Sequence, residues 1–245
     1  MSSNAAVGAD RFSKKPLYAQ LRDALAERIS AGAWKPGAAI ANESDLAREF
    51  GVSAGTMRKA LDLMEAERLL TRRQGRGTFV NDQASDELSL RFSSLRAANG
   101  QHLDGHAQTT LVGEDAASDE ECERLQLGPH DRIYHIHRTR LHKNQPLMVE
   151  HAAVPAAMFP SLGEKVEVPS RIIVLAQQYG VLLGKAEERV SIGQAAKVVA
   201  DALGIAPGAP VMVLDRVVQA LDGRPVEWRV GWCHLADNYY RVEMA

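Results

Sequence analysis

The sequence lacks the features of an exported, membrane-spanning or disulfide-rich protein. No apolar run of about 18 residues occurs in the 245-residue chain, so no membrane-spanning helix is expected. Residues 1–15 are mostly small or polar and contain no apolar signal core, so nothing indicates export. The two cysteines, Cys122 and Cys233, form no disulfide framework and no metal-binding spacing. We expect both to be reduced, packed side chains in a cytoplasmic protein.

Motifs of the common enzyme classes are also missing. There is no Ser-His-Asp order, no phosphate-cradling glycine loop and no Cys-x-x-Cys. His135 and His137 are two residues apart, so on a strand they would share one face. A pair of metal ligands is one interpretation of them, and packed or exposed histidines are the other. We predict no enzyme activity, no catalytic residues, no metal and no cofactor.

The length and the charge distribution indicate two parts. A chain of 245 residues suits one large or two ordinary domains, and 45% apolar residues support a buried core. The net charge of −2 hides an asymmetry: residues 11–80 carry 13 Lys and Arg against 8 Asp and Glu, whereas the rest carries 16 against 23. This favours a nucleic-acid-binding module joined to a second, acidic part, although ordinary surface scatter would also account for the charge alone.

The central motif of the basic part is a helix-turn-helix. Asn42 can cap a helix, with Asp45 three residues later as a weak form of the capping box, and Gly51 can end it. Ser53 then caps a second helix, whose apolar stripe recurs at helical spacing in Met57, Leu61 and Met64. An amphipathic helix over residues 16–31 precedes them, with Pro16 in its first turn. This order is typical of a DNA-binding helix-turn-helix.

A basic hairpin follows the helix-turn-helix. Two short runs, Leu69–Gln74 and Thr78–Val80, are joined at Gly75-Arg76-Gly77. A helix-turn-helix followed by a hairpin is a winged helix, whose recognition helix enters the major groove with its first turns towards the bases. Arg76 can enter the minor groove, where arginine is attracted. The predicted DNA-binding residues are Ser53, Thr56, Arg58, Lys59, Arg72, Gly75, Arg76, Gly77 and Thr78.

Two alternatives bear on the recognition helix. Arg58 and Lys59 would form a solvated helix face if no DNA bound there. The small residues Ala54 and Gly55, by contrast, would allow the helix backbone to approach DNA closely.

Residues 16–80 resemble the DNA-binding domain of the GntR family. The matching pieces, in family order, are Pro16-Leu17-Tyr18, Pro36-Gly37, Glu43, Leu46-Ala47, Phe50-Gly51-Val52-Ser53, Thr56-Met57-Arg58, Ala60-Leu61 and Gly75-Arg76-Gly77-Thr78-Phe79-Val80. The chain departs from the family in two places. Ala54 stands where an arginine is usual, and Ile40-Ala41-Asn42-Glu43 stands where Leu-Pro-Ser-Glu is usual. The loss of that arginine leaves the operator sequence open.

The second part alternates strand-like and helix-like segments. Two of its stretches, residues 127–146 and 203–225, share the order Leu-Gly, turn, strand, Arg, strand, polar turn, Pro, strand. Arg138 and Arg216 occupy equivalent positions in the two stretches. A duplicated helix-hairpin unit explains the echo, and two such units can pair into one sheet. We expect strands at 106–112, 132–141, 147–154, 181–192, 211–221 and 225–234, and helices at 118–125, 170–179 and 195–203.

Arg138 and Arg140 are the candidate ligand-binding pair. They are two apart on a predicted strand, so both point to one face, and Glu150 on the next strand can lie near them. Two converging guanidiniums bind a carboxylate or phosphate well, although a solvated sheet face is the alternative. Trp228 and Trp232 either line an aromatic pocket there, which would favour a ring-bearing acid, or belong to the core.

Residues 90–245 resemble, more loosely, the UTRA domain of HutC-type regulators, which is related in fold to chorismate lyase. The resemblance implies a ligand sensor in which Arg138, Arg140, Glu150, Ser170 and Glu227 hold an acidic effector. The relationship to chorismate lyase is one of fold and carries no chemistry with it.

The sequence therefore predicts an α+β protein with a winged helix-turn-helix joined to a chorismate-lyase-like (UTRA) domain with a mostly antiparallel sheet. We expect a disordered tail at residues 1–13, the DNA-binding domain at 14–81, a linker at 82–90 and an effector-binding and dimerisation domain at 91–245. The predicted function is a cytoplasmic, homodimeric repressor of transcription that binds a two-fold symmetric DNA operator and is released by a small acidic metabolite. An activator of the same family, or a lyase-like enzyme with a nucleic-acid module, are the alternatives.

Overall fold

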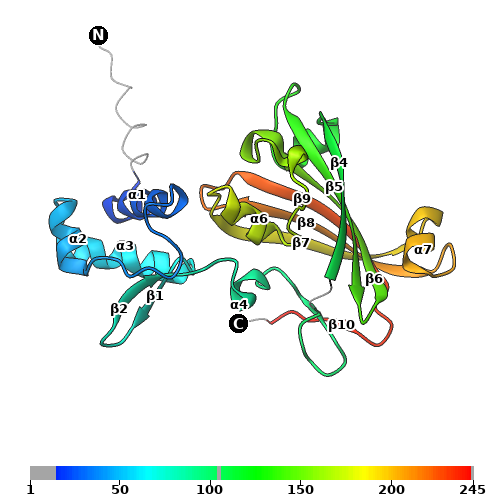
Figure 1. The fold of residues 1–245 in the computed structure, drawn as a ribbon, viewed down its shortest axis with the longest axis horizontal. Helices are drawn as coiled ribbons and strands as arrows, with labels where there is room; N and C mark the ends of the chain where they lie inside the picture. Colours follow the sequence, from blue (N-terminus) through cyan, green and yellow to red (C-terminus); the bar gives the residue numbers. More distant parts are fainter. Residues whose placement is uncertain (1–14, 104–105, 244–245) are drawn as a thin grey trace, which may run out of the picture. The chain divides into compact units, whose positions relative to one another are not determined.

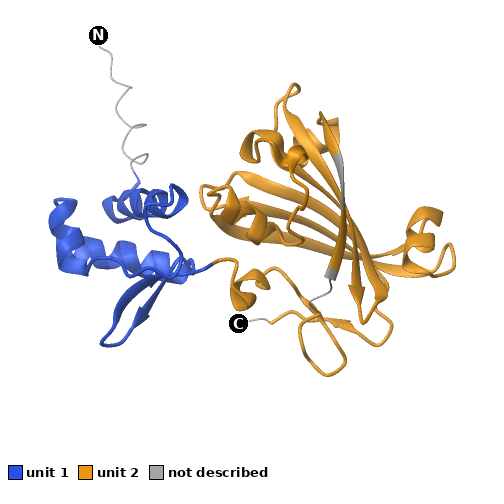
Figure 2. Cartoon of the chain, viewed as in Figure 1, with its two compact units in different colours: residues 1–82 blue, residues 83–245 orange. Residues whose placement is uncertain are grey.

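The computed structural model describes residues 15–103 and 106–243. The predicted disordered tail, residues 1–13, lies outside the described residues. The chain forms two compact units, residues 1–82 and residues 83–245, which are coloured separately in Figure 2.

The first unit is three helices and a hairpin. Its elements are α1 (Leu17–Ser30), α2 (Glu43–Glu49), α3 (Ala54–Ala66), β1 (Leu70–Arg73) and β2 (Gly77–Val80). The apolar stripes expected from the sequence meet in the core, where Leu25, Leu46, Met57 and Met64 are almost fully buried. Burial of such side chains stabilises each by about 1.5–3 kcal/mol relative to an exposed one. The predicted order of helix, turn, helix and hairpin is confirmed.

Side-chain caps fix the starts of α2 and α3. Asn42 Oδ1 accepts a hydrogen bond from the Asp45 backbone N–H at 2.9 Å, and Asn42 Nδ2 donates to the Asp45 carboxylate at 2.7 Å. The Asp45 carboxylate thus accepts from the side chain of Asn42, whereas the longer glutamate of a full capping box accepts from the backbone N–H of the cap residue. Ser53 Oγ accepts from the Thr56 backbone N–H at 3.2 Å. Between the helices Gly51 has φ +63°, which is accessible to glycine at little cost.

The hairpin is a short antiparallel ladder with a glycine-rich tip. Its register runs from Leu70 opposite Val80 to Arg73 opposite Gly77. Residues 38–40, which precede α2, pair with the free edge of β2. The Ile40 backbone N–H donates to Thr78 O and the Val80 backbone N–H donates to Ala38 O, both at 2.9 Å. Gly75 and Gly77 both have positive φ, so the tip needs glycine for its backbone conformation.

The second unit is built on a six-stranded antiparallel sheet in the order β4-β5-β6-β9-β8-β7 (Figure 1). Its strands are β4 (His106–Ala116), β5 (Arg132–His142), β6 (Gln145–Pro155), β7 (Leu183–Gln194), β8 (Pro210–Ala220) and β9 (Pro225–Cys233). A second, two-stranded sheet pairs β10 (Tyr239–Tyr240) with β3 (Leu95–Arg96). Its helices are α4 (Asp86–Ser89), α5 (Asp119–Leu125), α6 (Ile172–Gln178) and α7 (Lys197–Leu203), with short 3-10 turns η1 (Ala156–Met158) and η2 (Leu162–Glu164). No helix among the described residues is both long and apolar enough to span a membrane.

The sheet has the internal symmetry that the sequence echo predicted. The hairpin β5–β6 and the hairpin β8–β9 lie on either side of the sheet centre, where β6 pairs with β9. Arg138 on β5 lies opposite Glu150 on β6, and Arg216 on β8 lies opposite Arg229 on β9. The expectation that the two helix-hairpin units pair into one sheet is confirmed.

Helices cover both faces of the sheet. We call the face covered by α6 the inner face and the face covered by α5 and α7 the outer face. On the inner face α6 packs on the main core, with Ile172, Ile173 and Leu175 buried against strand residues such as Ile136 and Val218. On the outer face α5 and α7 pack in two separate clusters: Leu125 of α5 with Ala153 and Trp228, and Val199 of α7 with Val149 and Trp232. The predicted Ser118 capping box begins α5, with Glu121 accepting from the Ser118 backbone N–H at 2.8 Å.

Candidate functional site

The predicted DNA-contacting hydroxyls lie at the start of α3. Ser53 Oγ and Thr56 Oγ1 are 2.9 Å apart and hydrogen-bonded to each other, in addition to the helix cap. Gly55 is exposed, and an added Cβ there would meet only Ser53 Oγ, at 4.0 Å. The fold therefore does not require a glycine at this position.

The predicted arginines of this unit are held by neighbouring carboxylates. Arg58 makes a two-pronged ion pair with Glu43, with Nε–Oε2 at 3.1 Å and Nη2–Oε1 at 2.8 Å, while its side chain stays 65% exposed. Arg72 pairs with Asp62 at 2.6 Å and Glu65 at 2.7 Å. Such pairs between exposed side chains contribute about 0–1 kcal/mol, so a phosphate can replace the carboxylate partner at little cost. To contact DNA, Arg58 and Arg72 would exchange a carboxylate partner for a phosphate, because neither guanidinium is unpaired.

Lys59 on α3 and Arg76 at the hairpin tip differ from these two. Both are exposed, and neither has an ion pair with any described residue. Gly75, Gly77 and Thr78 surround Arg76 in the turn and the first residues of β2. Arg73 instead lies over the Phe79 ring, with 4.8 Å between Cζ and the ring centroid.

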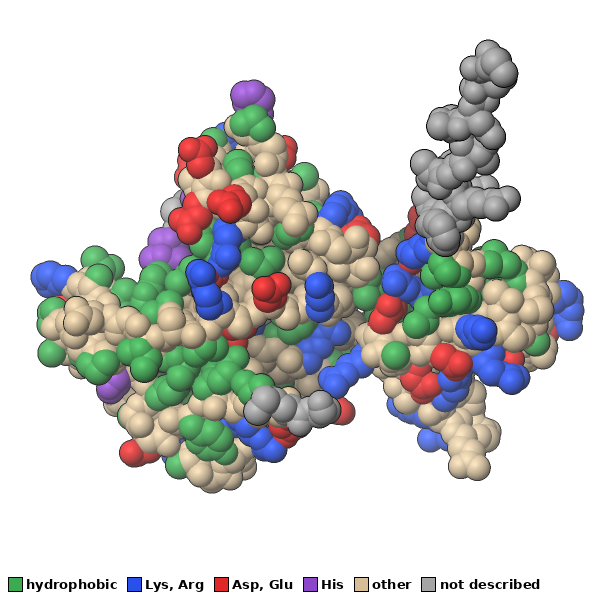
Figure 3. All heavy atoms as spheres, turned by 180° about the vertical axis from the view of Figure 1, so that it is seen from behind, with side chains coloured by type: hydrophobic (Ala, Val, Ile, Leu, Met, Phe, Trp, Pro, Cys, Tyr) green, Lys and Arg blue, Asp and Glu red, His purple; other side chains and the backbone are tan. Residues whose placement is uncertain are grey.

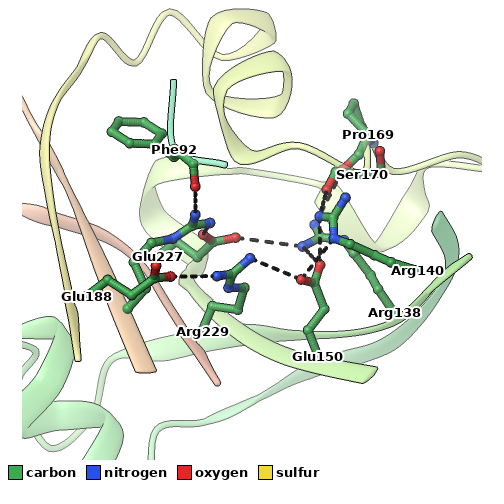
Figure 4. Close-up of polar contacts among 10 residues, drawn as sticks. Phe92, Arg138, Arg140, Glu150, Pro169, Ser170, Glu188, Glu227 and Arg229 are labelled. Atoms are coloured by element: carbon green, nitrogen blue, oxygen red, sulfur yellow. Dashed lines mark hydrogen bonds and ion pairs between the residues drawn. The ribbon is translucent and has the colours of Figure 1, made fainter. Parts of the chain in front are cut away.

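The second candidate site is a buried cluster of charged side chains on the inner face of the sheet (Figure 4). Glu150 is completely buried and Arg138 is 2% exposed. Arg138 Nη1 donates to Glu150 Oε1 at 3.3 Å and lies 3.7 Å from Glu227 Oε1. The strand period of two places Arg138 and Arg140 on the same face, as expected.

Arg140 makes the closest contacts to Glu150. Its Nε donates to Oε2 at 3.1 Å and its Nη2 to Oε1 at 2.9 Å, the geometry of a bidentate guanidinium–carboxylate pair. Arg140 Nη2 also donates to the Ser170 backbone carbonyl at 2.7 Å. The structure therefore brings Arg138, Arg140, Glu150, Ser170 and Glu227 together, with Ser170 contributing its carbonyl.

Three members of the cluster were missed by the sequence reasoning. Arg229 on β9 donates to Glu150 at 3.2 Å and to Glu188 on β7 at 2.8 Å, and Arg216 on β8 donates to Glu227 at 3.2 Å. Arg229 is two residues after Glu227 on one strand, so the alternation that paired Arg138 with Arg140 also predicts that Arg229 faces the cluster. Glu188 faces it because it lies opposite Arg216 in the β7–β8 register.

The cluster has more positive than negative charge. Each of its four arginines contacts at least one of its three glutamates, and the formal charges sum to +1. Burial by itself raises the pKa of Glu150, but the guanidiniums of Arg140, Arg229 and Arg138 outweigh burial and hold its pKa far below the ordinary range. Glu150 is therefore ionised. Burial and the neighbouring guanidinium of Arg229 lower the pKa of Arg216, the direction expected where guanidiniums crowd together. A buried site with excess guanidinium charge attracts an anion.

A small cavity of about 60 Å³ lies over this cluster. One wall is the cluster itself, and the opposite wall comes from the segment of residues 89–95 and from Tyr240. Arg216 Nη1 donates to the Phe92 carbonyl at 2.6 Å, Arg171 Nη1 donates to Ser89 Oγ at 2.6 Å, and Tyr240 donates its hydroxyl to Glu188 at 2.7 Å. A cavity of this volume has room for only a few water molecules, so a larger ligand requires this wall to move.

Of the two alternatives for Trp228 and Trp232, the first is wrong, because neither lines the arginine pocket. Both lie on the outer face, where they line a different cavity with His137 and His151. The reason is strand alternation: Glu227 and Arg229 face inward, so Trp228 between them faces outward, and Trp232 follows four residues later. His135 and His137 lie on this outer face too, opposite Arg138 and Arg140 as expected. Among the described residues no group of three or more His, Cys, Asp or Glu has an arrangement that holds a metal ion.

Comparison with known proteins gives matches over both units. Residues 17–80 match the family model "Bacterial regulatory proteins, gntR family", and residues 100–239 match the UTRA domain model. The Escherichia coli (strain K12) mannosyl-D-glycerate transport/metabolism system repressor MngR is 29% identical over 215 residues, which cover 87% of this chain and 90% of that protein.

Two further comparisons agree. The histidine utilization repressor of Pseudomonas putida is 31% identical over 149 residues, which cover 59% of each chain. The crystal structure of the possible transcriptional regulator YydK from Bacillus subtilis has a TM-score of 0.55 at 19% identity and covers 94% of this chain and all of that one. At that identity the structural likeness shows the fold.

Proposed function

The chain belongs to the GntR family of bacterial regulatory proteins, in the HutC-type branch that carries a UTRA domain, and we propose that it is a repressor. As a member of this family it is a ligand-responsive DNA-binding regulator of transcription and not an enzyme. Its relatives support this sign of regulation, since MngR and the P. putida protein are both named repressors. The two names refer to different metabolites, so neither identifies the effector of this chain. We further propose that it acts in the cytoplasm as a homodimer on a two-fold symmetric operator.

The proposed DNA contacts are those of the first turns of α3 and of the hairpin tip. Ser53, Thr56, Arg58 and Lys59 approach the major groove, and Arg76 approaches the minor groove with Arg72, Gly75, Gly77 and Thr78 beside it. Arg58 exchanges Glu43 for a phosphate or a guanine edge when DNA binds. Lys59 and Arg76 contribute charge without giving up an ion pair.

The proposed effector is a small acid bound at the inner-face cluster. The observation that carries this proposal is the excess of arginine over glutamate charge around Glu150, beside a small cavity. A carboxylate or phosphate would interact with Arg138 and Arg140 in place of part of the Glu150 contact, with Ser170 and Glu227 at the edges. A neutral ligand would leave the excess charge uncompensated, which is costly inside a protein.

Residues 89–95, which form one wall of the cavity, are the segment through which a bound effector would influence DNA binding. Residues 89–95 follow the end of the first unit along the chain, and they are held by Arg216 at Phe92 and by Arg171 at Ser89. A ligand that fills the cavity must displace this wall, so we infer that it changes the path of the segment leading to the DNA-binding unit. The ligand shifts DNA affinity only if it binds the two arrangements of that segment with different affinity.

The first test is DNA binding by the purified full-length protein. We expect a gel shift on the region upstream of its own gene, with an affinity that falls steeply as salt rises, because several phosphates are neutralised. A complex that does not weaken with salt contradicts this mode of binding. The effector is sought with a thermal-shift screen of carboxylates and sugar phosphates, since a ligand of the folded form raises the melting temperature.

The second test separates the two sites. Arg58→Ala should weaken DNA binding, whereas Arg138→Ala should leave it unchanged and abolish the response to the effector. Arg132→Ala is the matched control, because Arg132 is on the same strand as Arg138 but is exposed and pairs with Glu114. If Arg138→Ala abolished DNA binding and Arg58→Ala abolished the effector response, the assignment of the two sites would be reversed.

A further inference from the structure

The outer face of the sheet contains a second, larger cavity. Its volume is about 360 Å³, within the range of about 300–1,000 Å³ that is usual for small-molecule sites. The side chains that decide its chemistry are Glu121, His137, His151, Trp228, Val230 and Trp232. Figure 3, which views the molecule from behind, shows hydrophobic and histidine side chains side by side on the second unit.

The strand register explains the shape of this cavity. His137, His151 and Val230 lie in one row across β5, β6 and β9. Trp228 and Trp232 stand two residues before and after Val230 on β9, so one indole lies on each side of the row. Trp228 packs with Leu125 of α5, and Trp232 packs in the cluster of Val199 of α7. The two helices support the indoles and leave the row between them uncovered.

The floor of the cavity is made of neutral imidazoles. The His137 and His151 rings are stacked, with centroids 4.0 Å apart and an angle of 14° between them, and Trp232 meets His151 edge-on at 5.2 Å. Burial lowers the pKa of His137 and of His151, and the neighbouring histidines lower both further. A protonated pair would place two like charges in contact. Both rings are therefore uncharged at neutral pH, and each can accept a hydrogen bond from a ligand.

The charged groups that line the cavity include two carboxylates. Glu120 is exposed, and Glu121 is fixed by Ser118 Oγ at 2.6 Å and by His135 Nε2 at 2.7 Å. Burial raises the pKa of Glu121, but the hydrogen bonds from Ser118 and His135 outweigh burial and keep it below the ordinary range, so the carboxylate is ionised. Among the described residues no lysine or arginine lines the cavity, and Arg124, whose Cζ lies 5.3 Å from the Trp228 ring centroid, is paired with Asp215. An anion is therefore disfavoured here, in contrast to the inner face.

We propose that this outer-face cavity is a binding site for a small organic cation that carries an aromatic or heteroaromatic ring. The ring lies between the Trp228 and Trp232 indoles over Val230, and the ammonium or similar cationic group faces Glu120, Glu121 and the imidazole floor. Aromatic rings attract both a second ring and a cation placed over their face. The site is separate from the proposed effector site, because the two open on opposite faces of the same strands.

The experiment uses the full-length protein with Trp34→Phe, so that Trp228 and Trp232 are the only tryptophans left. Tryptophan fluorescence is excited at a wavelength where phenyl compounds do not absorb. The probes are 2-phenylethylamine, 2-phenylethanol and 3-phenylpropionate, which share a phenyl ring and differ in charge. We expect a saturable change with the amine, a weaker one with the alcohol, and at least tenfold weaker binding of the carboxylate at this site. Equal or tighter binding of the carboxylate overturns the proposal.

Variants locate the binding. Trp228→Leu should weaken binding of the amine by about 2- to 13-fold, the range expected for loss of an aromatic–aromatic contact. Glu120→Lys, at an exposed position where the fold is not at risk, should weaken the amine and strengthen the carboxylate. Arg132→Gln, at an exposed position of β5 that does not line the cavity, is the control and should leave amine binding unchanged.

Three further results contradict the proposal: no saturable change with any probe, no effect of Glu120→Lys, or loss of amine binding in Arg132→Gln. If no probe binds and light scattering shows that Trp228→Leu dissociates a dimer, the outer face is an interface between copies and the proposal is wrong.

Discussion

Replacing Glu150 by Gln tests the charge balance of the inner-face cluster directly. The substitution keeps the shape of the side chain and leaves four arginines facing two glutamates, Glu188 and Glu227. Glu150 is completely buried and accepts hydrogen bonds from three guanidiniums at 2.9–3.3 Å. Removal of one partner from a buried ion pair typically costs about 3–5 kcal/mol, because the remaining charges are left uncompensated. We expect a loss of that size in the free energy of unfolding of the second unit.

The assay is urea unfolding in the Trp34→Phe background, in which tryptophan fluorescence reports on the second unit alone. The loss should be constant between about pH 5 and pH 8, because the folded pKa of Glu150 lies below its ordinary value of about 4.3 and its contribution is lost only as the pH falls through the folded value. Glu187→Gln is the matched control, since Glu187 is exposed on the same strand as Glu188. It should change stability by less than about 0.5 kcal/mol.

Inorganic phosphate supplies the decisive arm of this experiment. If the cluster binds anions, phosphate should stabilise Glu150→Gln more than the wild type. The variant should gain about 2.7 kcal/mol at 100 times its own dissociation constant for phosphate. A loss below about 1 kcal/mol together with no phosphate effect would refute the view that an unbalanced buried charge defines this site.

Three further predictions concern other parts of the chain. Gly55→Ala should stabilise the first unit by about 0.5–1 kcal/mol in urea unfolding, since a Cβ has room there, but should weaken DNA binding; unchanged DNA affinity would show that no close approach occurs at this position. Arg76→Ala should reduce the slope of log K against log salt by about 0.9 in fluorescence anisotropy, the value for one phosphate, and an unaltered slope would remove Arg76 from the DNA contacts. Stability of the second unit should fall as the pH is lowered from about 6.5 towards the depressed folded pKa values of His137 and His151, because the unfolded chain then binds more protons. His151→Gln should make that dependence shallower in urea unfolding measured between pH 5 and pH 7.5, and an unchanged dependence would show that His151 is not held neutral.

Local signals in the sequence predicted local structure well. The caps at Asn42, Ser53 and Ser118 are where residue spacing placed them, because a cap depends only on the next three residues. Arg138 and Arg140 share a face for the same kind of reason, since strand alternation is a property of the chain itself. These features needed no knowledge of how distant segments meet.

Long-range pairing was harder to predict. Nothing local shows that β9 lies beside β6, and it is this pairing that brings Arg229 against Glu150. Likewise, the Glu43 partner of Arg58 comes from the preceding helix, and only the packing of α2 on α3 brings the two side chains together. The tryptophans are a different case, because their outward direction follows from being odd-numbered steps away from Glu227. Strand alternation therefore decides between the two alternatives for Trp228 and Trp232 without knowledge of any distant contact.

The alternation of the two faces also limits how the sheet can change in length. A one-residue insertion or deletion within β5, β6 or β9 would turn over every side chain beyond it, so that arginines would face outward and indoles would face the charged cavity. Extra residues in the turns at 143–144 and 222–224 would not have this effect, because the alternation of side chains within each strand would stay unchanged. Descendants of this protein can therefore vary in hairpin length, whereas both cavities would be lost together if any of these three strands gained or lost a single residue.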